Sequence, residues 1–338
     1  MSQSGGLKKI LVTGGSGMIG RSVIARLLAS KKCLVKTQVR DRLETRSKLG
    51  ASMDLTMVEM EQADFTRVGD QEMRALTKGC DVVIHCAGLV HNEQAAYQEY
   101  EVINVRATQQ LAEACAANGV STLVFLSTSA VYGKGPFKNI PEGGPLAAKT
   151  PYAVSKATSE AFLQSLNGRI PRVIVFRPSM VFGEGDRGNM LSLIRQIKKE
   201  EYFHISGGTT PKSLIYVDDL ARAIIACVEK APPGYHVFNV ANPQPVSTKV
   251  LVEEIAQALG VTKKFPSLPE GILKLGAKAA QAFMPGKINV TPEQIEKMAT
   301  ETTCSVDKLV TAIGFSPSIN LSDAIKKEID WANANKLL

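Results

Sequence analysis

The chain has 338 residues, of which 44% are apolar, 21% charged and 6% aromatic. This is the composition of a globular protein, and it excludes an intrinsically disordered chain, a collagen-like repeat and a coiled coil. No run of about 18 uncharged apolar residues occurs, and no apolar leader precedes the first predicted strand. We therefore expect a soluble, cytoplasmic protein that does not insert into a membrane.

The net charge is +8, and much of it lies in one segment. Residues 31–48 contain seven basic and two acidic side chains. Such a cluster can be a solvated face, a nucleic-acid patch or a pocket for a phosphorylated ligand, and its place in the fold decides among them. The six cysteines and four histidines have neither a C-x-x-C pair nor metal-ligand spacing, so we expect reduced thiols and no metal site.

The first half of the chain alternates short apolar runs with helical patterns. Strands are predicted at 9–13, 34–39, 55–60, 82–86, 123–126 and 173–176, with helices after the first strand and around 70–78, 94–118 and 151–167. This alternation predicts a parallel sheet covered by helices on both faces, which is the α/β class of Rossmann-type, doubly wound folds.

Beyond about residue 180 the alternation loosens, which predicts a smaller, mostly helical C-terminal lobe. Its expected elements are a helix at 189–199, a strand at 214–217, a helix at 219–229, a strand at 235–240, a helix from the Ser247 N-cap to Gly260, a capping box at 291–294 and a helix at 321–334. The apolar segment 268–284 carries Lys274 and Lys278, and we expect it to be a packed helix at the edge of this lobe.

The first predicted strand runs directly into a glycine turn. Gly14, Gly17 and Gly20 are spaced G-x-x-G-x-x-G between that strand and a helix. Such glycines let the backbone approach a pyrophosphate, whose charge is met by free N–H groups and the positive end of the helix. Because the turn follows an apolar strand and opens a β-α-β unit, it predicts a dinucleotide site.

The residues after the second strand bear on which dinucleotide binds. About 20 residues past the glycines an NAD site normally offers a carboxylate to the ribose, whereas this chain has Arg40, with Arg42 close by. A guanidinium fits a 2′-phosphate, and the basic segment lies where the adenosine ribose is expected. The sequence therefore favours NADP over NAD, while Asp41 keeps NAD as the alternative.

Tyr152 and Lys156 form a second motif, four residues apart on a helix that Thr150 can cap and Pro151 can begin. A free tyrosine titrates near pH ~10, so a base that works near neutrality needs its pKa lowered by about three units. Lys156 and an oxidised nicotinamide are both cations that can lower it. The pattern is common by chance and needs support from a second motif.

That support comes from three hydroxyl residues, Ser127, Thr128 and Ser129, which end the predicted strand 123–126 and can hold a substrate oxygen. Together with the glycine turn and the Tyr-Lys pair, they make the sequence resemble the extended short-chain dehydrogenase/reductase superfamily. Within it, the chain is similar to the NAD-dependent epimerase/dehydratase family, in the branch of nucleotide-sugar 4-epimerases and 4-ketoreductases. The resemblance spans nearly the whole chain.

The resemblance implies roles for individual residues. Tyr152 exchanges the hydroxyl proton, Lys156 lowers the pKa of that phenol and holds the nicotinamide ribose, and Thr128 hydrogen-bonds the reacting oxygen. The cofactor-binding residues that it implies are Gly14, Gly17, Met18, Ile19, Gly20, Arg40, Asp64, Phe65, Cys86, Ala87, Gly88, Asn104, Tyr152, Lys156 and Pro178. The implied substrate-binding residues are Thr128, Ser129, Asn189, Met190 and Lys212, the last replacing a phosphate-binding arginine of the family.

The resemblance also implies the organisation of the chain. We expect residues 1–178, joined again by 213–241, to form the NAD(P)-binding domain, and residues 179–338 to form mainly the substrate-binding lobe. We further expect a homodimer in which the helix near 94–118 and the helix with Tyr152 form the interface.

These features imply an NAD(P)-dependent enzyme that transfers a hydride at a secondary alcohol or ketone. The expected substrate position is C4 of a UDP-linked hexose or 6-deoxyhexose, and both a 4-ketoreductase and a 4-epimerase fit. Arg40 favours the reductase, because exchangeable NADPH suits reduction. Two alternatives stay open: a 3β-hydroxysteroid-dehydrogenase-like enzyme acting on an apolar alcohol, and a non-catalytic NADP-binding scaffold or sensor. We expect no nucleic-acid partner.

Overall fold

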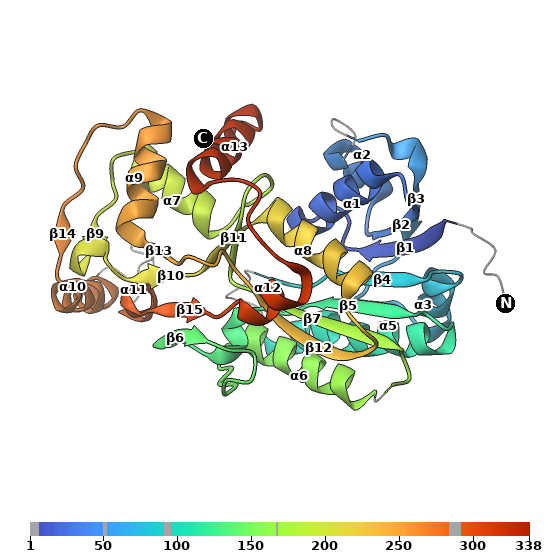
Figure 1. The fold of residues 1–338 in the computed structure, drawn as a ribbon. Coiled ribbons are helices and arrows are strands. Elements are labelled where there is room, and N and C mark those ends of the chain that lie inside the picture. Colours follow the sequence, from blue (N-terminus) through green and yellow to red (C-terminus); the bar gives the residue numbers. More distant parts are fainter. Residues whose placement is uncertain (1–6, 50–52, 91–95, 167, 284–291) are drawn as a thin grey trace.

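A seven-stranded parallel sheet lies at the centre of the protein (Figure 1). The computed structural model describes residues 7–49, 53–90, 96–166, 168–283 and 292–338. In spatial order the strands are β12 (Gly234–Val240), β7 (Arg172–Pro178), β5 (Thr122–Leu126), β4 (Val82–His85), β1 (Lys8–Thr13), β2 (Cys33–Val39) and β3 (Val58–Gln62). The strand order reverses between β1 and β4, so the crevice where such sheets bind ligands lies outside the ends of these two strands.

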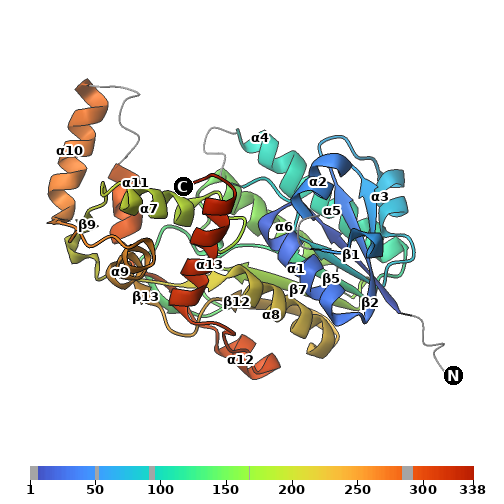
Figure 2. The ribbon, with the colours of Figure 1, turned by 90° about the horizontal axis from the view of Figure 1, so that it is seen from above.

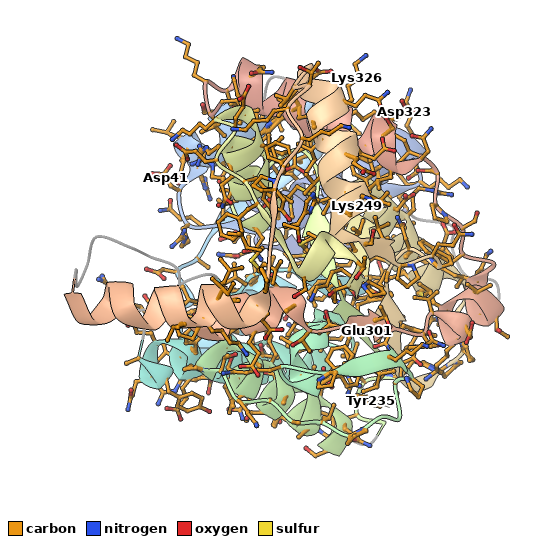
Figure 3. All side chains as sticks on the ribbon, turned by 90° about the vertical axis from the view of Figure 1, so that its left-hand side faces the viewer. Asp41, Tyr235, Lys249, Glu301, Asp323 and Lys326 are labelled. Carbon is orange, nitrogen blue, oxygen red and sulfur yellow. The ribbon has the colours of Figure 1, made fainter. Side chains whose placement is uncertain are left out.

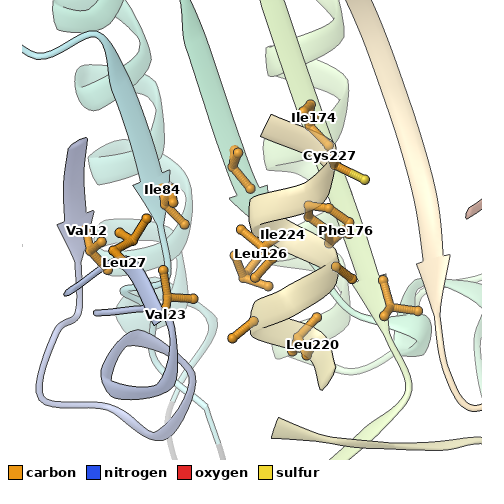
Figure 4. Close-up of a cluster of buried hydrophobic side chains, with 14 of the residues drawn as sticks. Val12, Val23, Leu27, Ile84, Leu126, Ile174, Phe176, Leu220, Ile224 and Cys227 are labelled. Carbon is orange, nitrogen blue, oxygen red and sulfur yellow. The ribbon is translucent and has the colours of Figure 1, made fainter. Parts of the chain in front are cut away.

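Helices cover both faces of the sheet, as the alternation predicts. One face carries α1 (Met18–Ser30), α8 (Val217–Lys230) and α12 (Asp307–Ile313). The other face carries α3 (Asp70–Thr77), α5 (Ala107–Ala117) and α6 (Pro151–Ser165). Side chains of each strand alternate between the two cores: Val12, Ile84 and Phe176 face α1 and α8 (Figure 4), whereas Leu11 and Phe125 face the other helices. The doubly wound fold is confirmed.

The second lobe has its own core, in which α7, α9 and α13 bring together Ile194, Ile255 and Ile325. Its helices are α7 (Asn189–Lys198), α9 (Thr248–Leu259), α10 (Glu270–Phe283), α11 (Pro292–Ala299) and α13 (Leu321–Ala334). Its strands are β8 (Met180–Phe182), β9 (His204–Ile205), β10 (Pro211–Lys212), β11 (Leu214–Tyr216), β13 (Val246–Ser247), β14 (Ser267–Leu268) and β15 (Thr302–Cys304). The short strand β6 (Phe137–Ile140) joins it by pairing with β15.

The chain crosses between the two parts more than once. After β8 and α7 it returns through α8 to β12, which pairs with β7 at the edge of the sheet. β11 instead pairs with β8, and α12 packs against α8 and β12. Beyond residue 178, α8, β12 and α12 therefore belong with the sheet, whereas β11, which also lies within 213–241, pairs with β8.

The helix expected at 94–118 is divided into three parts, and residues 91–95 lie outside the described residues. α4 (Tyr97–Tyr100) leads into a π-helical turn, η2 (Glu101–Arg106), and α5 follows. A π-helical turn is wider than an α-helical one and is common at functional sites. Here it carries Asn104, one of the predicted cofactor residues.

Two further predictions of local structure need correction. The basic segment contains a helix, α2 (Arg42–Leu49), which has no apolar stripe to reveal it. The strand expected from residue 55 begins at Val58, because the Asp54 carboxylate accepts hydrogen bonds from Thr56 and holds residues 55–57 in a 3₁₀ turn, η1 (Leu55–Met57).

α10 is the expected helix at the edge of the second lobe, and it packs against α11, where Leu273 contacts the cluster of Ile205 and Ile295. Seen from above, it lies at the outer end of the lobe with α11 beside it (Figure 2), and the view from the left-hand side of Figure 1 shows it across the near face (Figure 3). Ile272 and Leu275 are 63% and 71% exposed. Within the described ranges, no helix is long and apolar enough to cross a membrane.

Candidate active site

The predicted site residues come from different strands but meet at one edge of the sheet. Because β1, β4, β5 and β7 are parallel, the residues that follow each of them lie along the same edge. Gly14 follows β1, Cys86 follows β4 and Ser127 follows β5, while Pro178 ends β7 and is buried. α6 begins at this edge, where Thr150 caps it through a 3.2 Å bond from the Ala153 amide to the Thr150 hydroxyl.

The glycine turn has the close packing that its spacing predicts. Gly14 has a φ of +69°, and a Cβ placed there would lie 2.8 Å from the backbone nitrogen of Ala87. A Cβ on Gly20 would overlap the carbonyl oxygen of Gly14. Gly17 is the N-cap of α1 and has no side chain to accept its first amides. Met18 and Ile19 then form the first turn, so this backbone fits the pyrophosphate of a dinucleotide.

Gln38, which sequence reasoning missed, holds this turn in place. Its Oε1 accepts a 3.0 Å hydrogen bond from the Gly14 amide, and its Nε2 donates a 2.5 Å bond to the Ala63 carbonyl. The Gln38 carbonyl also accepts a 3.4 Å bond from the Gly15 amide. The only sign of this role in the sequence is a glutamine near the end of the predicted strand 34–39.

Tyr152 and Thr128 are brought together as predicted, but their electrostatics differ from expectation. The Thr128 hydroxyl lies close enough to the Tyr152 phenol to influence its pKa. Burial raises the pKa of the Tyr152 phenol to about 12, and the Thr128 hydroxyl acts in the opposite direction. Lys156 is not among the causes of this shift in the protein by itself, so the lowering of the phenol pKa by Lys156 stays a prediction for the site with its cofactor.

Lys156 is buried at 4% exposure beneath the same edge. Its Nζ donates a 2.8 Å hydrogen bond to the Leu126 carbonyl and lies 4.7 Å from the centre of the Phe125 ring. Burial lowers the pKa of Lys156 to about 8. A Cβ on Gly88 would lie 3.2 Å from this Nζ and 3.1 Å from Asn104 Oδ1, so predicted cofactor residues converge on the lysine.

Asn104 connects the cofactor edge to the helix with Tyr152. Its Oδ1 accepts a 2.7 Å bond from the Leu89 amide, and its Nδ2 donates a 3.0 Å bond to the Ser155 hydroxyl. Ser155 in turn donates a 2.8 Å bond to the Tyr152 carbonyl. Asn104 therefore fixes the loop after β4 relative to the start of α6.

His85 extends this chain of hydrogen bonds to the glycine turn. Its Nδ1 lies 2.7 Å from the Thr13 hydroxyl, and its Nε2 lies 3.0 Å from the Thr108 hydroxyl. The Thr13 hydroxyl accepts a bond from the Ala87 amide, and Thr108 donates to the Asn104 carbonyl. Burial lowers the pKa of His85 to about 3, so the ring is neutral and structural. The buried Cys86 thiol beside it has a pKa raised by burial to about 12.

The residues predicted to lie near the adenosine differ in how far they are exposed. Arg40 is exposed directly after β2, where its charge helps to lower the pKa of the Asp64 carboxyl, an effect that is due first to hydrogen bonds from Thr66. Phe65 is 7% exposed, and its ring packs 6.0 Å from that of His85. This ring packs in the core with little exposed surface, and its contact with an adenine stays a prediction.

Two of the predicted substrate residues have structural partners instead. The Met190 side chain is 1% exposed in the core of the second lobe. The Lys212 ammonium donates to the Thr300 carbonyl and so joins β10 to the turn after α11. Asn189 is exposed at the start of α7, and Ser129 is partly buried beside Thr128. α7 is capped by Asp186, which the sequence did not indicate and whose Oδ2 accepts from the Met190 amide at 3.1 Å.

The model of the NAD dependent epimerase/dehydratase family matches residues 10–241, which include the glycine turn and the Tyr-Lys pair. The chain belongs to this family. Its members are NAD-dependent enzymes, so the class of enzyme and the superfamily that the sequence resembles are both confirmed.

Similar proteins agree with this assignment over most of the chain. The chain is 27% identical to the N-acetyl-alpha-D-glucosaminyl-diphospho-ditrans,octacis-undecaprenol 4-epimerase of Escherichia coli O157:H7, covering 83% of this chain and 88% of that protein. It is 26% identical to the UDP-glucose 4-epimerase of Vibrio cholerae, covering 95% and 94%. The UDP-glucuronic acid 4-epimerase from Bacillus cereus, solved with NAD, has the same fold with a TM-score of 0.77, 22% identity and coverage of 97% and 99%.

Proposed function

We propose that this family member transfers a hydride at C4 of a hexose linked to UDP. The observation that carries the proposal is the placement of the Thr128 hydroxyl beside the Tyr152 phenol, at the sheet edge that also carries the glycine turn and, beneath it, Lys156. The similar epimerases from E. coli and V. cholerae both act on a hexose attached through a diphosphate, which supports this class of substrate.

The glycine turn and the start of α1 would hold the dinucleotide diphosphate, and Lys156, Asn104 and Gly88 would face its nicotinamide end. When bound, the nicotinamide supplies the hydride acceptor or donor, and its oxidised form adds a positive charge that favours the phenolate. Tyr152 holds or releases the proton of the reacting hydroxyl. Thr128 orients that oxygen through its own hydroxyl, and Lys156 supplies a donor below its pKa of about 8.

The preferred dinucleotide in this proposal is NADP. Arg40 is exposed at the end of β2, where a guanidinium can bind a 2′-phosphate. Asp41, which a NAD-preferring site would use, instead accepts a 2.9 Å hydrogen bond from the Glu44 amide and caps α2. This supports an exchangeable NADPH and therefore a 4-ketoreductase, with a 4-epimerase that retains NAD as the alternative.

The decisive experiment denatures the purified protein and identifies the released nucleotide, then titrates the refolded protein with NADPH, NADH and UDP. NADPH binding with a UDP-induced thermal shift supports the ketoreductase, and retained NAD supports the epimerase. Absence of a shift at millimolar UDP would favour the apolar-alcohol alternative. A Tyr152→Phe variant that binds dinucleotide but keeps full turnover would contradict the mechanism and favour the non-catalytic scaffold.

A homodimer also belongs to this proposal. On α6 the partly buried side chain of Phe162 lies beside Gln110 and Glu113 of α5, and these two helices are the predicted interface. Light scattering measures the mass in solution, and a mass of about one chain would contradict the dimer. The cytoplasmic location stays a prediction.

A further inference from the structure

Arg21 lies between the glycine turn and a loop of the second lobe. It is the fourth residue of α1 and directly follows Gly20. A Cβ on Gly185 would collide with its Nη2 and would lie 3.4 Å from Met18 Cβ. The guanidinium is therefore wedged between the start of α1 and the segment 183–188, which connects β8 to α7.

The guanidinium of Arg21 finds no hydrogen-bond acceptor among the residues that the structure describes. Its Nε is buried without a hydrogen-bond partner, and Arg21 forms no ion pair with any part of the chain that the structure describes. The negative charge of Glu184 raises the pKa of Arg21, but its Oε2 accepts a 2.7 Å bond from the Tyr216 hydroxyl and makes no ion pair with Arg21. A charged N–H buried without an acceptor is destabilising, so this position points to a ligand.

Arg187 is a second cation near Arg21, and its positive charge makes the charged form of the Arg21 guanidinium less favourable. Burial lowers the pKa of Arg21 most, and the positive charge of Arg187, on the segment 183–188, lowers it further. Arg26, one to two turns further along the same helix, shows the usual arrangement. Its Nε donates a 2.6 Å bond to Asp218 Oδ1, and its Nη2 bonds to the other carboxylate oxygen. Two neighbouring cations that form no ion pair with a carboxylate of the described residues are typical of an anion site.

We propose that Arg21 binds the diphosphate of the dinucleotide held by the glycine turn, and so fastens the segment 183–188 over the cofactor. This inference rests on the proposed function, because it needs a dinucleotide at that turn. The helix start supplies backbone amides to the same anion, and a guanidinium adds two N–H donors in a fork that matches phosphate oxygens. The diphosphate of the nucleotide sugar is the other source of this chemistry, and the experiment separates the two.

The experiment compares wild type with Arg21→Met, which keeps the aliphatic stem and removes the donors. We expect NADPH and NADH binding, followed by nicotinamide fluorescence, to weaken about 10- to 100-fold. We expect the affinity for UDP to stay within about twofold of wild type, because the contact that is lost is to the dinucleotide diphosphate and not to the diphosphate of UDP. The unfolding temperature measured without nucleotide stays the same or rises, because a buried unsatisfied cation has been removed.

A structural arginine would behave differently, and Arg26→Met is the matched control. We expect that control to lower the unfolding temperature and to leave dinucleotide affinity unchanged, because its carboxylate partner is lost. Arg21→Met overturns the inference if it binds dinucleotide as tightly as wild type, if UDP affinity falls as much as that of NADPH, or if its unfolding temperature drops. If the wild type itself binds no dinucleotide, the proposed function fails instead.

Discussion

Arg177 and Glu160 form a buried ion pair that ties the end of β7 to α6. Arg177 Nη2 lies 2.5 Å from Glu160 Oε2, and Nε lies 3.1 Å from both carboxylate oxygens. The two residues are 5% and 3% exposed. Glu160 is one helical turn after Lys156, so the pair fixes the helix that carries the two predicted catalytic side chains. Arg177 Nη1 also donates a 2.9 Å bond to the Tyr132 hydroxyl.

Removing one partner of this pair should destabilise the fold strongly. Arg177→Met leaves the Glu160 carboxylate buried without its cation, and we expect the free energy of unfolding to fall by about 3–5 kcal/mol. Combining it with Glu160→Leu removes both charges and should recover much of that loss. Denaturant titration of the single and double variants gives the coupling energy. Additive losses in the double variant would contradict the ion pair as the cause.

Thr128 should act through its hydroxyl alone. Thr128→Val removes the hydroxyl beside Tyr152 that is proposed to orient the reacting oxygen, so we expect kcat to fall about 100-fold. Because the Thr128 hydroxyl lowers the pKa of the phenol, its loss should also move the ascending limb of the pH–rate profile of alcohol oxidation, in which the phenolate is the base, to higher pH. Thr128→Ser keeps a hydroxyl and should retain most of the activity. Equal activity of the serine and valine variants would rule out this role.

Arg40 should discriminate between the dinucleotides. Arg40→Ser removes the guanidinium proposed for the 2′-phosphate, and we expect NADPH binding to weaken about tenfold while NADH binding changes less than about twofold. Arg46→Gln, in the same basic segment, is the control and should leave both affinities unchanged. Isothermal titration with each dinucleotide measures them. A parallel loss of NADH affinity would show that Arg40 supports the fold and does not read the phosphate.

The sequence predicted the features that depend on interactions between residues close together along the chain. The glycine turn, the cap at Thr150 and the strands with alternating burial follow from backbone sterics and periodicity. The residues missed or misplaced depend on tertiary contacts. Phe65 packs in the core, the Lys212 ammonium donates to the Thr300 carbonyl, and Gln38 accepts a hydrogen bond from the Gly14 amide. No spacing along the chain reveals these partners.

The electrostatics of the site could not be read from the sequence for the same reason. The Tyr-x-x-x-Lys spacing predicts two side chains on one helix face, but it does not say how deeply they are buried. In the structure, burial raises the pKa of Tyr152 and lowers that of Lys156. Desolvation therefore outweighs the attraction that the motif predicts, and the balance depends on the surrounding strands.

The buried carboxyl of Glu328 allows the effect of burial on a pKa to be tested without measuring catalysis. It lies on α13 at 0% exposure, and its Oε2 accepts a 2.7 Å hydrogen bond from the Gly183 amide. Its Oε1 has no partner among the described residues. Burial, and then the negative charges of Asp186 and Glu184, raise the pKa of Glu328 to about 9. The carboxyl is therefore protonated in the folded protein near neutral pH.

The raised pKa makes the stability of the protein depend on pH in a defined direction. The unfolded chain loses the Glu328 proton near pH 4.5 and the folded chain near pH 9, so the folded state binds more protons between these values. The free energy of unfolding should therefore decrease as pH rises through this window, by at most about 1.4 kcal/mol per pH unit from this group. Glu328→Gln imitates the protonated form and removes the dependence. We expect the variant to match wild type near pH ~5 and to be the more stable protein near pH ~9, as measured by thermal unfolding across the range. Glu253→Gln, an exposed carboxylate 4.0 Å from Lys249, is the control, and a variant of Glu328 with the wild-type pH slope would show that this carboxyl is ionised in the fold.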